Sequence, residues 1–190
     1  MTHVHAVQAK NIKSAMGNKF GIRESIIEGK GAFAIKPIKK GELICYMNGE
    51  EISVSELKRR YEKGEERLSD PLQAEEEMYI DLYEPYIYIN HSCDPNAAVV
   101  KFNELISVRD IKVGQEITYD YSLTEWSNEE SWQDYNDWFI ECKCGSPSCR
   151  KRIGEFYLLP KNIQEKNIKQ GNVRDFIIKR YKKHYEKQYT

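Results

Sequence analysis

Three closely spaced cysteines have the character of a metal-binding loop. Cys142, Cys144 and Cys149 supply three soft ligands in a segment that also contains glycine and proline. A closed structural zinc site holds four ligands in a tetrahedron, and zinc binds thiolates readily. The sequence therefore predicts a structural zinc ion whose fourth ligand comes from elsewhere in the chain.

Two other cysteines are candidates for that fourth ligand. Cys45 lies in the apolar run 43–47, where a cysteine usually acts as a small buried hydrophobe. Cys93 lies in a polar loop that contains proline, so it is the better ligand. The alternative, reduced thiols without a metal, remains open.

Two polar segments carry further candidate chemistry. Residues 90–96 read NHSCDPN, and residues 116–121 read EITYDY. The adjacent His91, Ser92 and Cys93 could suggest a nucleophile with its base. Neighbouring side chains seldom reach the geometry that such a pair requires, however, and no separate strong base is evident.

A third segment, Gly29-Lys30-Gly31, lies upstream. It is not a phosphate-binding loop, because the G-K-[ST] ending is missing, and it lacks the third glycine of a dinucleotide fingerprint. Taken alone, it is typical of a hairpin turn.

In their order and spacing, these segments resemble the SET-domain protein lysine methyltransferases over about residues 19–156. The resemblance implies an α+β fold with mostly short curved β-sheets, a knot-like C-terminal segment, peripheral helices and a basic C-terminal helix. It also implies methyl transfer from S-adenosylmethionine to a protein lysine. In that family the N-H-S-C cysteine, here Cys93, completes the zinc site.

The resemblance further implies which residues contact S-adenosylmethionine. Asn90 suits the ammonium and carboxylate of its methionine end, and His91 contacts its adenine largely through the backbone. Glycine lets a bulky ligand approach the main chain closely. The segment that presents backbone to the cofactor consists of Glu28, Gly29, Lys30 and Gly31. As an alternative, Asn90 simply forms a turn.

Two tyrosines match the catalytic positions of the family. Tyr121 matches the tyrosine whose phenol lies near the methyl group and the sulfonium, where it positions the reactants. Tyr119 would hold the amine, or a water beside it, and so limit the number of methyl groups. The alternative is that both tyrosines only fill β-strands. Ile87-Tyr88-Ile89 stands where the family commonly has an arginine before the N-H motif, which puts details of the cofactor pocket in doubt. The cysteine-rich pre-SET segment of many histone-directed members is missing, which leaves histone specificity open.

Composition favours an ordered globular protein. Of 190 residues, 40% are hydrophobic and the net charge is −1, which argues against a dedicated nucleic-acid binder. An odd number of cysteines, no apolar signal core and no long apolar run indicate an intracellular protein, cytoplasmic or, in a eukaryote, nuclear, without membrane contact.

Charge is distributed unevenly. Residues 50–94 contain 13 acidic and 5 basic residues, whereas residues 161–190 contain 9 basic and 3 acidic ones. These runs are either solvated faces or, for the acidic ones, the flanks of a groove for a basic protein such as a histone. The basic tail leaves an auxiliary nucleic-acid contact by the C-terminal helix as an option.

Local patterns predict the elements. Short strands form a small meander over 20–52, and further strands cover 79–89, 97–110 and 116–121. Part of 53–77 is helical, with Ser53 or Ser55 as its N-cap and Pro71 as an interruption. A stripe of Ile177, Tyr181, Tyr185 and Tyr189 indicates a C-terminal helix docked on a core.

We expect five regions. They are a flexible arm (1–18), the SET domain (19–122), an aromatic acidic connector (123–141), a post-SET zinc segment (142–158) and a basic C-terminal helix (159–190). The connector carries Trp126, Trp132 and Trp138, which fit either an aromatic lid or core packing. The competing function is a catalytically inactive SET-fold module that binds basic peptides. Intact Asn90, His91, Tyr119 and Tyr121 favour the enzyme.

Overall fold

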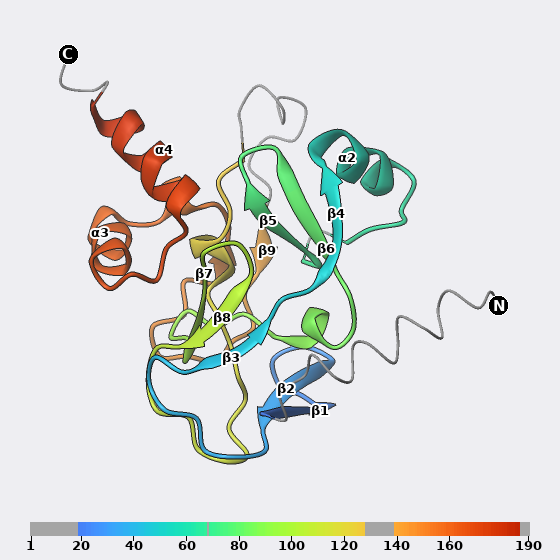
Figure 1. Ribbon diagram of the computed structural model, residues 1–190, viewed down its shortest axis with the longest axis vertical. Coiled ribbons are helices and arrows are strands. Elements are labelled where there is room, and N and C mark those ends of the chain that lie inside the picture. The colour runs from blue at the N-terminus through green and yellow to red at the C-terminus, as the bar shows by residue number, and fades with distance from the viewer. Residues whose placement is uncertain (1–18, 68, 128–138, 187–190) are drawn as a thin grey trace.

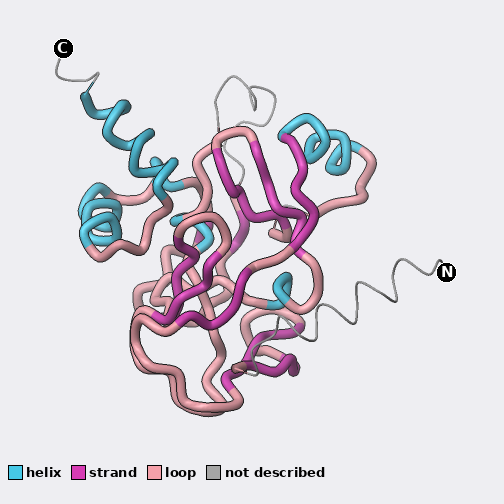
Figure 2. The backbone as a smooth tube through the Cα atoms, viewed as in Figure 1, coloured by secondary structure: helices cyan, strands magenta, loops and turns pink. Residues whose placement is uncertain are grey.

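The computed structural model describes residues 19–67, 69–127 and 139–186, which form the α+β fold expected from the sequence (Figure 1). In chain order the strands and helices are β1 (Phe20–Glu24), β2 (Lys30–Ala34), β3 (Leu43–Tyr46), β4 (Gly49–Ser53), α2 (Val54–Glu62), β5 (Pro71–Glu75), β6 (Met78–Leu82), β7 (Ala97–Val100), β8 (Glu104–Ser107), β9 (Ile140–Glu141), β10 (Arg152–Ile153), α3 (Lys161–Lys169) and α4 (Asp175–Glu186). Long loops connect many of them (Figure 2).

Within the described residues, the strands form four small antiparallel sheets. Their strand orders are β1-β2, β3-β8-β7, β4-β6-β5 and β9-β10. The expected meander over 20–52 is therefore wrong beyond the first hairpin. β3 and β4 pair instead with later strands, through Leu43↔Ile106 and Gly49↔Leu82. These pairings bury the apolar residues of β3 in the main core, where Cys45 is 3% exposed, as its apolar surroundings predicted.

Helix α2 confirms the expected helix. The Ser53 side chain accepts a hydrogen bond from the Glu56 backbone N–H and so caps the first turn. Val54 and Leu57 are buried on one face. The helix ends at Glu62, and Pro71 begins strand β5.

The strands expected over 79–89 and 116–121 are only partly present. Strand β6 ends at Leu82, and Tyr86–Tyr88 form a 3-10 helix. Residues 116–121 make isolated bridges instead of a strand, because their backbone bonds are divided between two neighbours. The Ile117 N–H donates to Ala32 O over 2.7 Å, whereas the Tyr119 N–H donates to Asn90 O over 3.2 Å. This division brings the β1-β2 hairpin and both polar motifs together.

Helices α3 and α4 lie on one side of the sheets, away from α2 (Figure 1). Helix α4 confirms the expected helix, since Phe176 and Ile177 are buried in a second core with Trp126 and Phe156. Helix α3 precedes it, which the sequence did not indicate. Trp126 is 5% exposed and stacks on Phe156, so for this tryptophan core packing is correct. Trp132, Trp138 and Tyr189 lie outside the described residues.

A buried arginine connects this second core to the sheets. Arg174 is fully buried, and its Nη2 donates to Ala74 O over 3.1 Å and to Phe102 O. Ala74 belongs to β5, and Phe102 lies in the turn between β7 and β8. The guanidinium therefore fastens the segment before α4 to two of the small sheets.

Candidate active site and cysteine cluster

A cavity of about 530 Å³ lies where the motifs meet. Residues from six parts of the chain line it: Ile27, Glu28, Gly29, Lys30, Arg67, Ser69, Asp70, Ile87, Tyr88, Asn90, His91, Tyr121, Ile140, Glu141, Lys143 and Ile153. Most of the residues assigned to the cofactor and one assigned tyrosine, Tyr121, thus share one cavity. Gly31 and Tyr119 are not part of the lining.

Gly31 has a different reason to be glycine. A Cβ atom at this position would lie 2.3 Å from Glu116 Oε1 and 2.9 Å from Ser25 Cβ. The glycine therefore makes room for the Glu116 carboxylate inside the protein. Gly29 is unlike it, because its φ of +41° lies in the left-handed region that favours glycine.

Asn90 is held by the segment that it faces. Its Nδ2 donates to Lys30 O over 2.9 Å, to Glu28 O over 3.3 Å and to Glu116 Oε1 over 2.8 Å. All three bonds use the amide nitrogen, which leaves the amide oxygen to accept from a ligand. Glu116 also accepts from Ser25 Oγ over 2.8 Å. Glu116 received no role from the sequence, although it opens the second motif.

Tyr121 lines the cavity, and a hydrogen bond fixes the orientation of its hydroxyl. The hydroxyl donates to Ile89 O over 3.0 Å, and the ring lies 4.7 Å from that of Tyr119. Burial, followed by the negative charges of Asp70 and Glu116, raises the pKa of the Tyr121 phenol above its ordinary value. Tyr119 is 4% exposed behind it, and burial raises the pKa of its phenol as well. Both hydroxyls are therefore neutral near pH 7.

Charged residues in the cavity wall are balanced in sign, with three acids and three bases among the lining residues. Lys143 Nζ lies 2.8 Å from Glu28 Oε2, which connects the residues after β9 to the β1-β2 turn. Arg67 Nε donates to Asp70 Oδ2 over 2.9 Å. Sequence patterns did not point to Arg67, Asp70 or Lys143, because neither their spacing nor their neighbours distinguish them from other surface charges.

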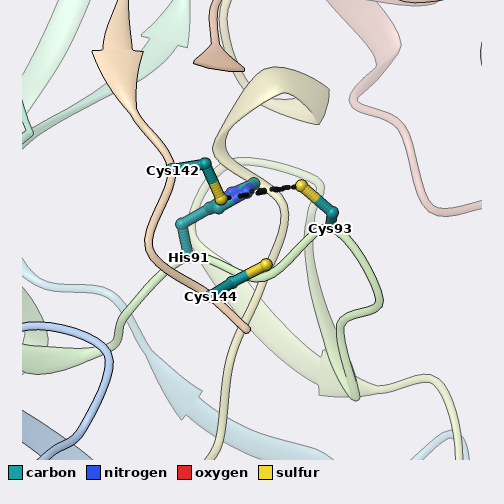
Figure 3. Close-up of side chains that lie close together, drawn as sticks. All are labelled: His91, Cys93, Cys142 and Cys144. Atoms are coloured by element: carbon teal, nitrogen blue, oxygen red, sulfur yellow. Dashed lines mark hydrogen bonds between the residues drawn. The ribbon is translucent and has the colours of Figure 1, made fainter. Parts of the chain in front are cut away.

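Three of the cysteines gather around His91, which also lines this cavity (Figure 3). Ligand atoms of His91, Cys93, Cys142 and Cys144 all lie within 4.8 Å of one another. The Sγ atoms of Cys93 and Cys142 are 3.7 Å apart. Thiolates about 2.3 Å from a tetrahedral zinc ion would be about 3.8 Å apart, so this separation fits the metal.

Cys149 is not one of these four residues, but it contacts two of them. Burial opposes ionisation of the Cys144 thiol, but hydrogen bonds from the backbone and from the Cys142 and Cys149 thiols outweigh it and lower the pKa to about 7. Cys149 Sγ also lies 3.8 Å from Cys142 O. The structure therefore places three of the four predicted cysteines in one group with His91, and it places Cys149 next to Cys142. It adds His91, which the sequence assigned to the cofactor alone.

Comparisons with known proteins identify the family of this chain. Residues 29–122 match the family model of the SET domain. This chain belongs to the SET-domain family. The match ends just after Tyr121, so the second core and most of the cysteines lie outside it.

The relatives that this chain resembles are longer proteins, and the chain covers only part of each. The chain is 33% identical over 145 residues to the variant-silencing SET domain-containing protein of Plasmodium falciparum, covering 67% of this chain and 5% of that protein. It is 28% identical over 167 residues to the probable histone-lysine N-methyltransferase set-23 of Caenorhabditis briggsae, covering 78% and 66%. For human histone-lysine N-methyltransferase 2D, the identity is 31% over 162 residues, covering 78% and 3%. The chain thus spans from 3% to 66% of the length of these relatives.

None of the helices in the described ranges combines the length and the apolar character needed to cross a bilayer.

Proposed function

We propose that this protein is a protein lysine N-methyltransferase that uses S-adenosylmethionine. The observation that carries the proposal is the meeting of Tyr121 and Asn90 at one cavity. Membership of the SET-domain family and relatives named as histone-lysine N-methyltransferases support it.

The cavity fits the methyl donor in size and charge. Its volume of about 530 Å³ lies within the roughly 300–1,000 Å³ of small-molecule sites. Equal numbers of acidic and basic side chains suit the zwitterionic methionine end of S-adenosylmethionine. The Asn90 amide oxygen can accept a hydrogen bond from the ammonium of S-adenosylmethionine. The backbone of Glu28, Gly29 and Lys30 provides further polar groups to contact this molecule. When bound, this molecule supplies an activated methyl group on a sulfonium.

The reaction requires a neutral amine aimed at that methyl group. The lysine nitrogen forms a bond to the methyl carbon while the carbon–sulfur bond breaks, so the ammonium must first lose its proton. Lysine has a reference pKa near 10.4, and a partly dry site favours the neutral form. Because the Tyr121 phenol remains protonated, it positions and polarises the reactants and does not remove the proton.

Tyr119 would limit how many methyl groups are added. It lies directly behind Tyr121 and is buried. A phenol there, or a water that it holds, takes the room that a methylated amine needs to turn its lone pair toward the sulfonium. We therefore propose mono- or dimethyllysine as the product.

The substrate would be a basic protein, with histones as the first candidates because of the relatives' names. A histone substrate would place the protein in the nucleus. The structural zinc would be held by Cys93, Cys142, Cys144 and Cys149. The five regions, and the nucleic-acid contact by α4, stay predictions.

Labelled methyl transfer tests the function. The protein is incubated with methyl-labelled S-adenosylmethionine and either core histones or cell extract, and the modified residue is located by mass spectrometry. The matched control for Tyr121→Phe is Tyr46→Phe, which removes the same oxygen from an exposed tyrosine. Label on lysine that disappears only with Tyr121→Phe supports the enzyme. Binding of S-adenosylmethionine without transfer to any protein would instead indicate the inactive binding module.

A further inference from the structure

We propose that His91 links the zinc site to the catalytic tyrosine through its side chain, as a hydrogen-bond bridge and not as a metal ligand. One imidazole nitrogen would donate to the Cys93 thiolate, and the other accepts from the backbone N–H of Tyr121. His91 is a positioning residue in this role. The catalytic consequence rests on the proposed function, whereas the bridge itself does not.

The two nitrogens of the His91 ring contact different groups. His91 Nε2 lies 3.3 Å from Cys93 Sγ, and the Tyr121 N–H donates to His91 Nδ1 over 3.2 Å. In a neutral imidazole one nitrogen carries the proton and the other accepts. Since Nδ1 accepts from a backbone N–H, the proton belongs on Nε2, where it faces the sulfur.

The same contacts disfavour His91 as a ligand. A metal-bound Nε2 would have to present its lone pair, which moves the proton to Nδ1. Two N–H groups would then face each other at the Tyr121 backbone. Asp120 Oδ1 is the other acceptor near Nδ1, but it lies 3.5 Å away and accepts from Arg150 Nη2 over 2.6 Å and from the Ser122 N–H over 3.1 Å. His91 is therefore not the fourth donor, and Cys149, whose sulfur lies 3.8 Å from Cys142 O, would complete the set.

The surroundings hold the ring in this orientation. His91 is 4% exposed, and its ring packs edge-on against that of Tyr121 with centroids 5.4 Å apart. Backbone hydrogen bonds join the segment that contains His91 to the segment that contains Tyr121. The Tyr119 N–H donates to Asn90 O, and the Ser92 N–H donates to Tyr119 O. Cys93 receives a second donor, because the Arg150 N–H lies 3.3 Å from its sulfur. A charged thiolate accepts both bonds better than a neutral thiol does.

Each end of the bridge should therefore affect the other. Groups that hydrogen-bond to metal ligands typically contribute 10- to 100-fold to metal affinity. Removing the imidazole should weaken zinc binding by about that factor. It should also free the Tyr121 backbone, which lowers kcat more than it raises KM for the lysine substrate.

The test uses the full chain loaded with cobalt or zinc. The variant is His91→Phe, which keeps a ring but removes both bonds, and the control is His184→Phe, on an exposed side chain of α4. We expect the absorption spectrum of a four-thiolate cobalt site in the unmutated protein, its retention in both variants, and 10- to 100-fold weaker zinc binding for His91→Phe alone. A three-thiolate, one-imidazole spectrum in the unmutated protein would overturn the proposal. So would equal zinc affinity in the folded His91 variant.

A second measurement does not depend on the variant folding. Nitrogen chemical shifts of the His91 ring in the zinc-loaded protein should report a protonated Nε2 and an unprotonated Nδ1. A metal-bound Nε2 signal would refute the bridge. If these results hold but no methyl transfer is found, the bridge stands and the proposed function fails.

Discussion

The Asn90 amide nitrogen donates to the Glu116 carboxylate over 2.8 Å, and this bond joins the first residues of the two polar motifs. Glu116 occupies the space that the missing side chain of Gly31 leaves open. Three segments that are distant in sequence therefore meet at one carboxylate, which is hydrogen-bonded to Asn90 of the cavity wall.

This dependence predicts a steric effect of Gly31→Ala. The added methyl group would overlap the Glu116 carboxylate and Ser25, so we expect a loss of about 1–3 kcal/mol in the free energy of unfolding. Gly21→Ala in strand β1 is the matched control, because its Cβ would meet only Ile35 Cγ2 at an ordinary 3.4 Å. Urea unfolding of both variants measures the difference. Equal stabilities would show that Glu116 moves aside freely.

Tyr121→Phe should lower kcat by about 100-fold or more, as expected for loss of an oriented hydroxyl at the reacting centre. Affinity for S-adenosylmethionine should change only a few-fold, because the hydroxyl acts mainly in the transition state. Steady-state kinetics and calorimetric binding separate the two effects. Equal losses of binding and turnover would make Tyr121 part of the cofactor pocket only.

Tyr119→Phe should extend the product towards trimethyllysine. Removing one oxygen behind Tyr121 gives a dimethylated amine room to rotate, while the ring still fills the buried site. Mass spectrometry of the modified peptide at early times measures the product distribution. Efficient trimethylation by the unmutated protein would contradict this role for Tyr119.

Cys93→Ser should release the metal. Protein purified without chelator should contain about one zinc per chain, and the serine variant much less, because the tetrahedral ligand set is broken. Cys45→Ala is the control, since Cys45 lies in the main core, where burial raises the pKa of its thiol to about 12. Metal analysis of both variants decides the matter. Loss of zinc from the Cys45 variant alone would reverse the assignment.

Glu125→Gln should change how stability depends on pH. Burial raises the pKa of Glu125 to about 8, although a backbone hydrogen bond from Gln73 opposes this shift. The unfolded pKa is about 4.3, so the folded state holds the proton more tightly, and stability falls as pH rises from about 4 to 8. The variant should lose less stability than the unmutated protein between pH 5 and 8.

Urea unfolding at several pH values measures this difference. Glu165→Gln, on the exposed face of α3, should follow the unmutated curve. Parallel curves for Glu125→Gln and the unmutated protein would mean that the Glu125 carboxylate is ionised in the fold.

Much of the site could be predicted because its chemistry lies in residue types. Cys93 was preferred to Cys45 as a ligand because its sequence neighbours are polar, whereas those of Cys45 are apolar. The structure places Cys93 beside Cys142 and buries Cys45 in the main core. The strand expected at 116–121 failed because alternation predicts an extended backbone but cannot reveal that its hydrogen bonds go to two different partners. Arg67 and Asp70 could not be found, because only folding brings them to the cavity.

The hydrogen bonds of Arg174 bear on how far this protein can be shortened from its C-terminus. A version shortened after the zinc segment, near residue 160, would keep every motif. It would also remove Arg174, which donates to the carbonyls of Ala74 and Phe102, and expose Trp126 by removing the residues of α4 in its core. We therefore expect a version that ends near residue 160 to be less stable than the chain that continues through α4.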